Sequence, residues 1–193
     1  MKKALMIAII LVVAVISTAC INNIAVQELN NKAAEFMQKG DYESAMNRLQ
    51  ASLDLDSTMY QTYYNLGVAA INANKYDKAI EALEDGIKIK PDFADFYYSL
   101  GVAQIGYADY IYETTELKET ATADSETEEV KIEREVINFD KNQIVELKQS
   151  AILNLKKYLE LSPNTSEKDA VQEMINQCEE FISENKKKEE IKE

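Results

Sequence analysis

The chain is most constrained by one 34-residue stretch, Tyr60 to Phe93, in which two helix patterns are joined by a short turn. Residues three and four apart share one face of a helix, so small and large apolar residues at that spacing indicate a helix with one buried side. The two patterns consist of Tyr63, Leu66, Gly67 and Ala70, and of Tyr76, Ala79, Leu83 and Gly86. Pro91 ends the second helix, because proline cannot continue the hydrogen-bond ladder. The stretch therefore predicts a helix–turn–helix unit.

The same pattern recurs at a fixed period on both sides of this unit, as expected for a repeat array. Subtracting 34 gives a first unit at 26–59, and adding 34 gives a third unit that begins at residue 94. In the third unit the register is lost after Ile105 and returns at Ile144. The positions that match Ala70 and Ala79 are 47 residues apart instead of 9, so the third unit spans 94–163 with a predicted insertion of 38 residues at about 109–146.

These units resemble the tetratricopeptide repeat, because the small residues stand where its two helices cross and the large residues surround them. The resemblance covers roughly 26–105 and 144–163. It implies an all-α fold, a solenoid of about three repeats at 26–59, 60–93 and 94–163. An amphipathic pattern at 166–185 predicts a final helix that caps the stack, followed by a charged tail at 186–193.

The predicted insertion at 109–146 is strongly acidic, with 12 acidic and 4 basic residues. From within it to the end of the third unit, apolar or small residues recur every seven positions, which is typical of a helix. They are Val130, Ile137, Ile144, Ala151 and Tyr158. We expect two long helices, about Phe93–Glu116 and Glu126–Leu161, that project from the stack as a hairpin. A disordered acidic loop is the alternative, because 119–129 contains almost no apolar residue.

The N-terminus has the features of an export signal. Two lysines precede 13 apolar residues, Ala4 to Ile16, a length typical of a signal peptide and short for a membrane span. The segment from Ser17 to Cys20 resembles the lipobox of bacterial lipoproteins. That resemblance implies a signal peptide at 1–19, a lipid (palmitate) on Cys20 and a short tether at 20–25. Ordinary cleavage of a secreted protein and an uncleaved anchor at Ala4–Ile21 are the alternatives, and all three predict export to the bacterial cell envelope.

The composition argues against catalysis and nucleic-acid binding. The chain has no histidine, which excludes Ser-His and Cys-His pairs and the commonest transition-metal ligand. Its two cysteines, Cys20 and Cys178, do not form a zinc set, and no phosphate-binding glycine loop occurs. A net charge of −13 repels nucleic acid and favours basic partners. We therefore predict no enzyme activity, no metal site and no cofactor.

The tetratricopeptide resemblance implies a concave groove lined by the first helix of each repeat. By register, the groove positions are Asn30, Asn31, Ala34, Tyr64, Asn65, Val68, Ile71, Tyr98, Ser99, Val102 and Ile105. Asparagine amides can bond a peptide backbone, and tyrosine and valine offer apolar contact. The chaperone-binding members grip a terminal carboxylate with basic residues, but Asn30 and Asp95 stand at two of those places, so we expect an apolar or helical ligand instead.

Together these features predict a non-catalytic interaction module, a membrane-anchored adaptor or assembly factor in the bacterial envelope. It would bind a peptide or helix of a partner protein, basic or apolar, in the groove. One alternative is a structural subunit that self-associates through the acidic insertion. Another is an accessory subunit of an envelope enzyme.

Overall fold

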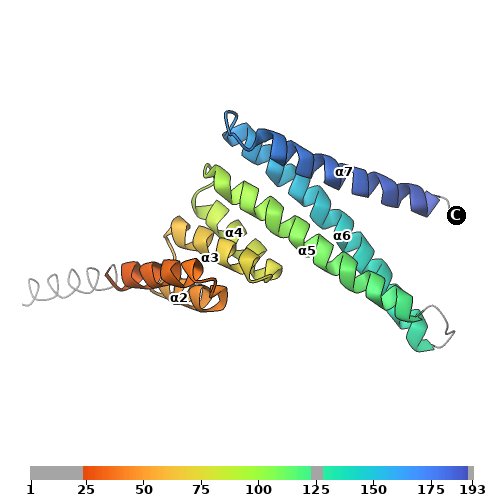
Figure 1. Ribbon diagram of the computed structural model, residues 1–193, viewed down its shortest axis with the longest axis horizontal. Helices are drawn as coiled ribbons and strands as arrows, with labels where there is room; N and C mark the ends of the chain where they lie inside the picture. The colour runs from red at the N-terminus through yellow and green to blue at the C-terminus, as the bar shows by residue number, and fades with distance from the viewer. Residues whose placement is uncertain (1–23, 123–127, 191–193) are drawn as a thin grey trace, which may run out of the picture.

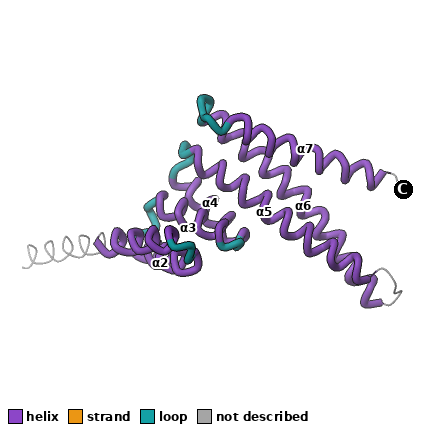
Figure 2. Tube along the Cα trace, in the orientation of Figure 1, coloured by secondary structure: helices purple, strands orange, loops and turns teal. Residues whose placement is uncertain are grey.

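The computed structural model describes residues 24–122 and 128–190, with side chains described for 24–114, 141–185 and Lys187. Within these ranges every regular element is a helix and no strand occurs (Figure 2). A first helix at 24–38 is followed by α2 (Tyr42–Leu55), α3 (Tyr60–Asn72), α4 (Tyr76–Ile89), α5 (Ala94–Thr122), α6 (Glu128–Leu161) and α7 (Lys168–Glu190). The predicted all-α fold is confirmed.

The helices are arranged as a chain of antiparallel pairs. From α2 onward each helix packs on the next, and α3 also contacts α5. The short helices stack at one end of the molecule, while α5 and α6 run side by side far beyond them and α7 follows α6 (Figure 1). The first helices of successive pairs therefore share one face of the stack, and the second helices share the other.

The turns inside the first two pairs are built alike. Gly40 and Asn74, one period of 34 apart, both have positive φ angles, of 76° and 56°. In each turn the next backbone N–H reaches back to the preceding helix: Asp41 donates to the Phe36 carbonyl at 2.9 Å and Lys75 donates to the Ala70 carbonyl at 2.8 Å. The left-handed conformation suits glycine and is tolerated by asparagine, so the sequence permits the same turn twice.

In the second and third pairs the helices cross where one of them has a glycine. A Cβ added at Gly67 would lie 2.5 Å from Leu83 Cγ, and one added at Gly101 would lie 2.8 Å from Leu155 Cγ. Both leucines are fully buried. Leu155 follows Leu83 by 72 residues, one 34-residue period and a further 38, which is the offset that the predicted insertion requires. The third pair therefore repeats the crossing of the second with much longer helices.

The two long helices differ in their bounds from those expected. Helix α5 continues to Thr122 instead of ending near Glu116, since 107–162 contains no glycine or proline to stop it. Of the residues that recur every seven positions, Ile144, Ala151 and Tyr158 are buried. Val130 and Ile137, like most of the predicted insertion, lie outside the residues whose side chains are described.

Helix α7 packs on α6 through an apolar stripe. Val171, Ile175 and Cys178 are buried in one cluster with Ile152 and Leu155 of α6. The helix extends to Glu190, so part of the expected charged tail at 186–193 is helical, because lysine and glutamate are good helix formers.

The predicted signal peptide at 1–19, the lipidation site Cys20 and most of the tether at 20–25 lie outside the described residues. Among the helices of 24–122 and 128–190, none combines the length and the apolar character needed to cross a membrane.

Candidate functional site

The face formed by the first helices has a hollow of about 320 Å³ between helix 24–38 and α3. It is lined by Gln27, Asn30, Asn31, Met59, Gln61, Thr62 and Asn65, and we call it the amide hollow. Five of these seven side chains are carboxamides, so the hollow offers both donors and acceptors and no net charge. Three of the predicted groove residues, Asn30, Asn31 and Asn65, are brought together here.

The side chain of Asn30 is engaged inside the protein. Its amide nitrogen donates to the Val26 carbonyl and to Ser52 Oγ, both at 3.0 Å, and its oxygen accepts from Thr62 Oγ1 at 3.3 Å. Ser52 and Thr62 are buried. The amide group that we assigned to a ligand thus joins helix 24–38 to α2 through a donated proton and to α3 through its oxygen.

Asn31 and Asn65 are placed differently. Asn31 is exposed and Asn65 is half-buried, and neither side chain makes a hydrogen bond to another described residue. These two amides are available to a bound molecule. The hollow can therefore form hydrogen bonds with an extended peptide backbone without disturbing the bonds of Asn30.

The aromatic residues of the predicted groove take part in packing. The Tyr64 ring lies edge-on to Phe93 and Phe96, with centroids 5.3 and 5.8 Å away. Burial raises the pKa of Tyr64, and a hydrogen bond to the buried Ser99 partly opposes the rise. Tyr98 packs on Tyr158 of α6, with ring centroids 5.2 Å apart.

The remaining groove positions are partly covered. Ile71 packs against the core of the first two pairs, and Ile105 packs against the cluster shared by α6 and α7. Val68 and Val102 are also half-buried, whereas Ala34 is exposed. Among the predicted groove residues, the accessible polar side chains therefore lie mainly in the amide hollow.

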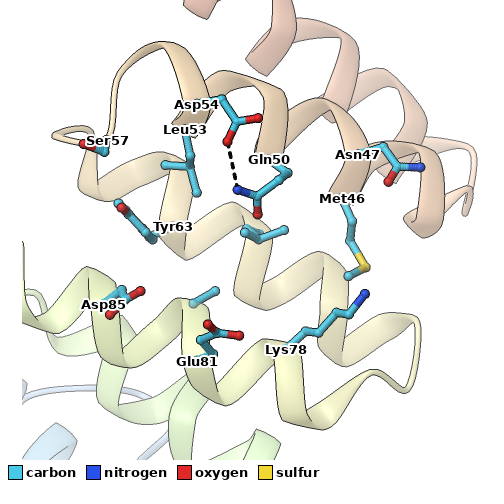
Figure 3. A pocket seen from close by; sticks show the side chains of 12 residues that line it. Met46, Asn47, Gln50, Leu53, Asp54, Ser57, Tyr63, Lys78, Glu81 and Asp85 are labelled. Carbon is cyan, nitrogen blue, oxygen red and sulfur yellow. Dashed lines mark hydrogen bonds between the residues drawn. The ribbon is translucent and has the colours of Figure 1, made fainter.

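A second hollow of about 460 Å³ lies on the opposite face, between α2 and α4 (Figure 3). Both helices pack on α3 and make few contacts with each other, so side chains of α3 form the floor between them. The lining consists of Met46, Asn47, Gln50, Leu53, Asp54, Ser57, Tyr63, Leu66, Lys78, Glu81, Ala82 and Asp85. We call this the acid-rimmed groove.

The edges of the acid-rimmed groove are charged and its floor is apolar. Asp54 of α2 accepts a hydrogen bond from Gln50 at 3.2 Å, and Asp85 of α4 pairs with Lys88 at 2.7 Å. Glu81 makes no ion pair or hydrogen bond with any described residue, although Lys78 is one turn away on the same helix. Our sequence analysis did not find this groove. The period gave no signal for it, because the residues one period away from Asp54, Glu81 and Asp85 are Lys88, Asn47 and Ala51.

The described part of the chain offers little for catalysis. No group of three or more histidine, cysteine, aspartate or glutamate side chains within it could hold a metal ion. Cys178 is a free thiol and is buried, and burial raises its pKa, which disfavours the reactive thiolate.

The fold described above can be compared with those of known proteins. Its features are crossings at glycine, repeated turns and stacked antiparallel helix pairs. Residues 36–105 match the sequence model of the tetratricopeptide repeat. The match spans α2 to α4 with the adjoining parts of helix 24–38 and α5. No curated protein matches the chain.

Solved tetratricopeptide-repeat structures have the same fold. The first such domain of Spaghetti (RPAP3), bound to the HSP90 peptide SRMEEVD, aligns with a TM-score of 0.57 and 13% identity, covering 82% of this chain and 93% of that one. The second domain of human RPAP3, in complex with the HSP70 peptide SGPTIEEVD, also aligns with a TM-score of 0.57, at 11% identity and 82% and 98% coverage. The Yersinia enterocolitica type III secretion translocator chaperone SycD aligns at 0.52, with 18% identity and 80% and 91% coverage. The predicted tetratricopeptide-like solenoid is thereby confirmed.

Proposed function

We propose that this chain is a non-catalytic protein-interaction module, which holds an extended segment of a partner protein against its first-helix face. The observation that carries the proposal is the amide hollow, in which Asn31 and Asn65 are free to bond a peptide backbone. The tetratricopeptide fold supports it, because two of the similar structures are domains bound to peptides.

The chemistry of the hollow selects among peptides. The peptides of the two similar structures, SRMEEVD and SGPTIEEVD, are acidic. No lysine or arginine lines the amide hollow, so it offers no positive charge to such a carboxylate. We therefore propose a neutral segment that is recognised through its backbone, with apolar contact from Met59 at the edge of the hollow.

We further propose that the module works at a membrane surface in a bacterial envelope, attached through a lipid on Cys20. The support is the sequence from Lys2 to Cys20 alone. An adaptor or assembly factor needs one fixed end and one binding face, and this arrangement supplies both. Incorporation of labelled palmitate by wild-type chain and not by Cys20→Ser tests the attachment.

The experiment for the binding face is in-cell crosslinking followed by mass spectrometry, with the Asn31→Ala and Asn65→Ala double variant beside the wild type. We expect the dominant crosslinked protein to be lost from the double variant, while its unfolding midpoint stays within a few degrees of wild type. Asn176→Ala, an exposed asparagine of α7 that lines neither hollow, is the matched control. Equal crosslinking by wild type and double variant would show that the hollow does not bind the partner.

A second candidate is a subunit that self-associates through its long helices. The observation in its favour is that α5 and α6 project beyond the stack and that Tyr110 and Tyr112 of α5 are 55% and 36% exposed (Figure 1). Sedimentation velocity separates the two proposals: a dimer that Tyr110→Ser dissociates favours self-association, and a monomer favours the adaptor.

A further inference from the structure

The acid-rimmed groove combines features that a surface used only for solvation lacks. Its floor is apolar, made by Met46 and Leu53 of α2, Tyr63 and Leu66 of α3, and Ala82 of α4. Met46, Leu53 and Leu66 are at most 8% exposed, so the floor is continuous with the core cluster of the first two pairs. An apolar side chain that enters the groove would thus extend that core and remove apolar surface from water.

The edges of the groove supply uncompensated negative charge. Three carboxylates, Asp54, Glu81 and Asp85, line it with one ammonium group, that of Lys78. Asp85 already has an ion-pair partner in Lys88, whereas Asp54 is bonded only to a neutral amide. Glu81 forms no ion pair or hydrogen bond with a described residue and interacts with Lys88 only through space. Asp54 rises from α2 and Glu81 from α4, on opposite sides of the floor (Figure 3). A basic side chain placed between them would find acids on both sides.

This combination belongs to one position in the stack. The residues of α6 that occupy the places of Glu81 and Asp85, 72 positions on, are Leu153 and Lys157. The next gap between second helices therefore lacks the acidic edge on its α6 side. The acids of α6 whose side chains are described, Glu146 and Glu160, stand 72 positions after Asn74 and Lys88, which do not line the groove.

We infer that the acid-rimmed groove is a second docking surface, which takes a short segment of a partner protein combining basic side chains with an apolar one. Charge complementarity selects this occupant: the apolar side chain seats on the floor while the basic ones face Asp54 and Glu81. A second copy of this chain is disfavoured, because its net charge of −13 repels the same edge. The groove lies on the face opposite the amide hollow, so a partner could hold both faces at once.

Binding of defined probes to the full-length chain tests the inference. The probe is a fluorescent acetylated peptide KLAKLSKL, with two comparison peptides, one carrying glutamate for every lysine and one carrying serine for every leucine. We expect only the basic amphipathic peptide to bind measurably. The variant Asp54→Asn with Glu81→Gln should raise its Kd about fivefold, since two exposed charge contacts are lost.

A matched variant separates groove binding from general attraction to an acidic protein. Glu84→Gln with Glu184→Gln removes the same charge from two exposed positions that do not line the groove. We expect this control to raise the Kd less than twofold. Equal weakening by both double variants, or equal binding of the serine-substituted peptide, would overturn the inference.

Methionine methyl NMR gives the location independently of affinity. The Met46 methyl resonance, assigned with Met46→Leu, should shift when KLAKLSKL is added, while the Met174 resonance on α7 should not. A shift at Met174 alone would overturn the inference, and so would a dimer in sedimentation velocity that the peptide dissociates, because a second copy would then be the occupant. Variants of Asn31 and Asn65 should leave these shifts unchanged, which keeps the test separate from that of the amide hollow.

Discussion

The second and third helix pairs make the same contact at their crossing and differ in almost everything else. Gly67 meets Leu83 in α3–α4, and Gly101 meets Leu155 in α5–α6. Yet α3 and α4 have 13 and 14 residues, whereas α5 and α6 have 29 and 34. The contact at the crossing is therefore the same for short and for long helices.

Beyond the crossing, the long pair uses interactions that the short pair lacks. Lys148 of α6, 8% exposed, pairs with Asp109 of α5 at 2.7 Å, and its ammonium lies 4.7 Å from the centroid of the Phe181 ring of α7. Tyr112 also meets Phe181, with ring centroids 5.6 Å apart. This cluster joins α5, α6 and α7.

The largest effect we predict tests whether the two crossings are energetically alike. Leu83→Ala and Leu155→Ala should each lower the free energy of unfolding by about 3 kcal/mol, because both leucines are fully buried and truncation leaves a cavity. Denaturant unfolding followed by circular dichroism measures both. Leu153→Ala is the control, since Leu153 is 69% exposed two residues from Leu155 and should change stability by less than about 0.5 kcal/mol. A cost for Leu155→Ala as small as that control would mean that the third crossing is not equivalent.

The next effect tests the interaction found only in the long pair. Asp109→Asn should cost about 1–2 kcal/mol, because the buried Lys148 ammonium loses its charged partner. Lys148→Met should cost less, since Asp109 is 57% exposed and water can solvate it. Glu113→Gln, an exposed acid one turn further along α5, should be neutral. If Lys148→Met proved the more damaging of the two, the ion pair would not be what stabilises this cluster.

The smallest effect concerns the turn that the two short pairs share. Asn74 has a φ angle of 56°, and its side-chain oxygen accepts a hydrogen bond from the Tyr76 hydroxyl. Asn74→Gly and Asn74→Ala both remove that bond, but only alanine is strained at positive φ. We expect alanine to be less stable than glycine by about 1 kcal/mol in the same denaturant assay. Equal stabilities would show that this turn relaxes at no cost.

The repeat architecture was predictable because it depends on residue size at fixed spacing. The positions of Gly67, Leu83 and Ala79 within one period define which faces meet, and the same spacing located Leu155 across 38 additional residues. Helix ends were less predictable. Helix α5 continues past Glu116 because the sequence there has no glycine or proline to end it. Without such a residue, the position of the helix end could not be predicted from the sequence.

The candidate sites were less predictable, since they depend on pairs of residues that the period does not connect. Asn30 lies on the first-helix face, but its hydrogen-bond partner Ser52 is 22 residues away on the second helix of the same pair. The acid-rimmed groove requires Asp54 and Glu81 to face each other across α3, and their spacing of 27 is not a multiple of the period. Both the Asn30 hydrogen bond and the acid-rimmed groove depend on the direction of individual side chains, which the 34-residue period does not specify.

The hydrogen bonds of Asn30 have a consequence for how the helix stack unfolds locally. Helix 24–38 is the first helix of the described residues, and a helix at the end of a stack is usually the first part to unfold locally. A shift of one residue along its neighbours would turn helix 24–38 by about 100° and carry the Asn30 amide away from Ser52 and Thr62. Two buried hydroxyls would then lack partners, at about 1–3 kcal/mol each. Helix 24–38 can therefore detach as a unit but cannot slide in small steps, and its amide protons should exchange with solvent together.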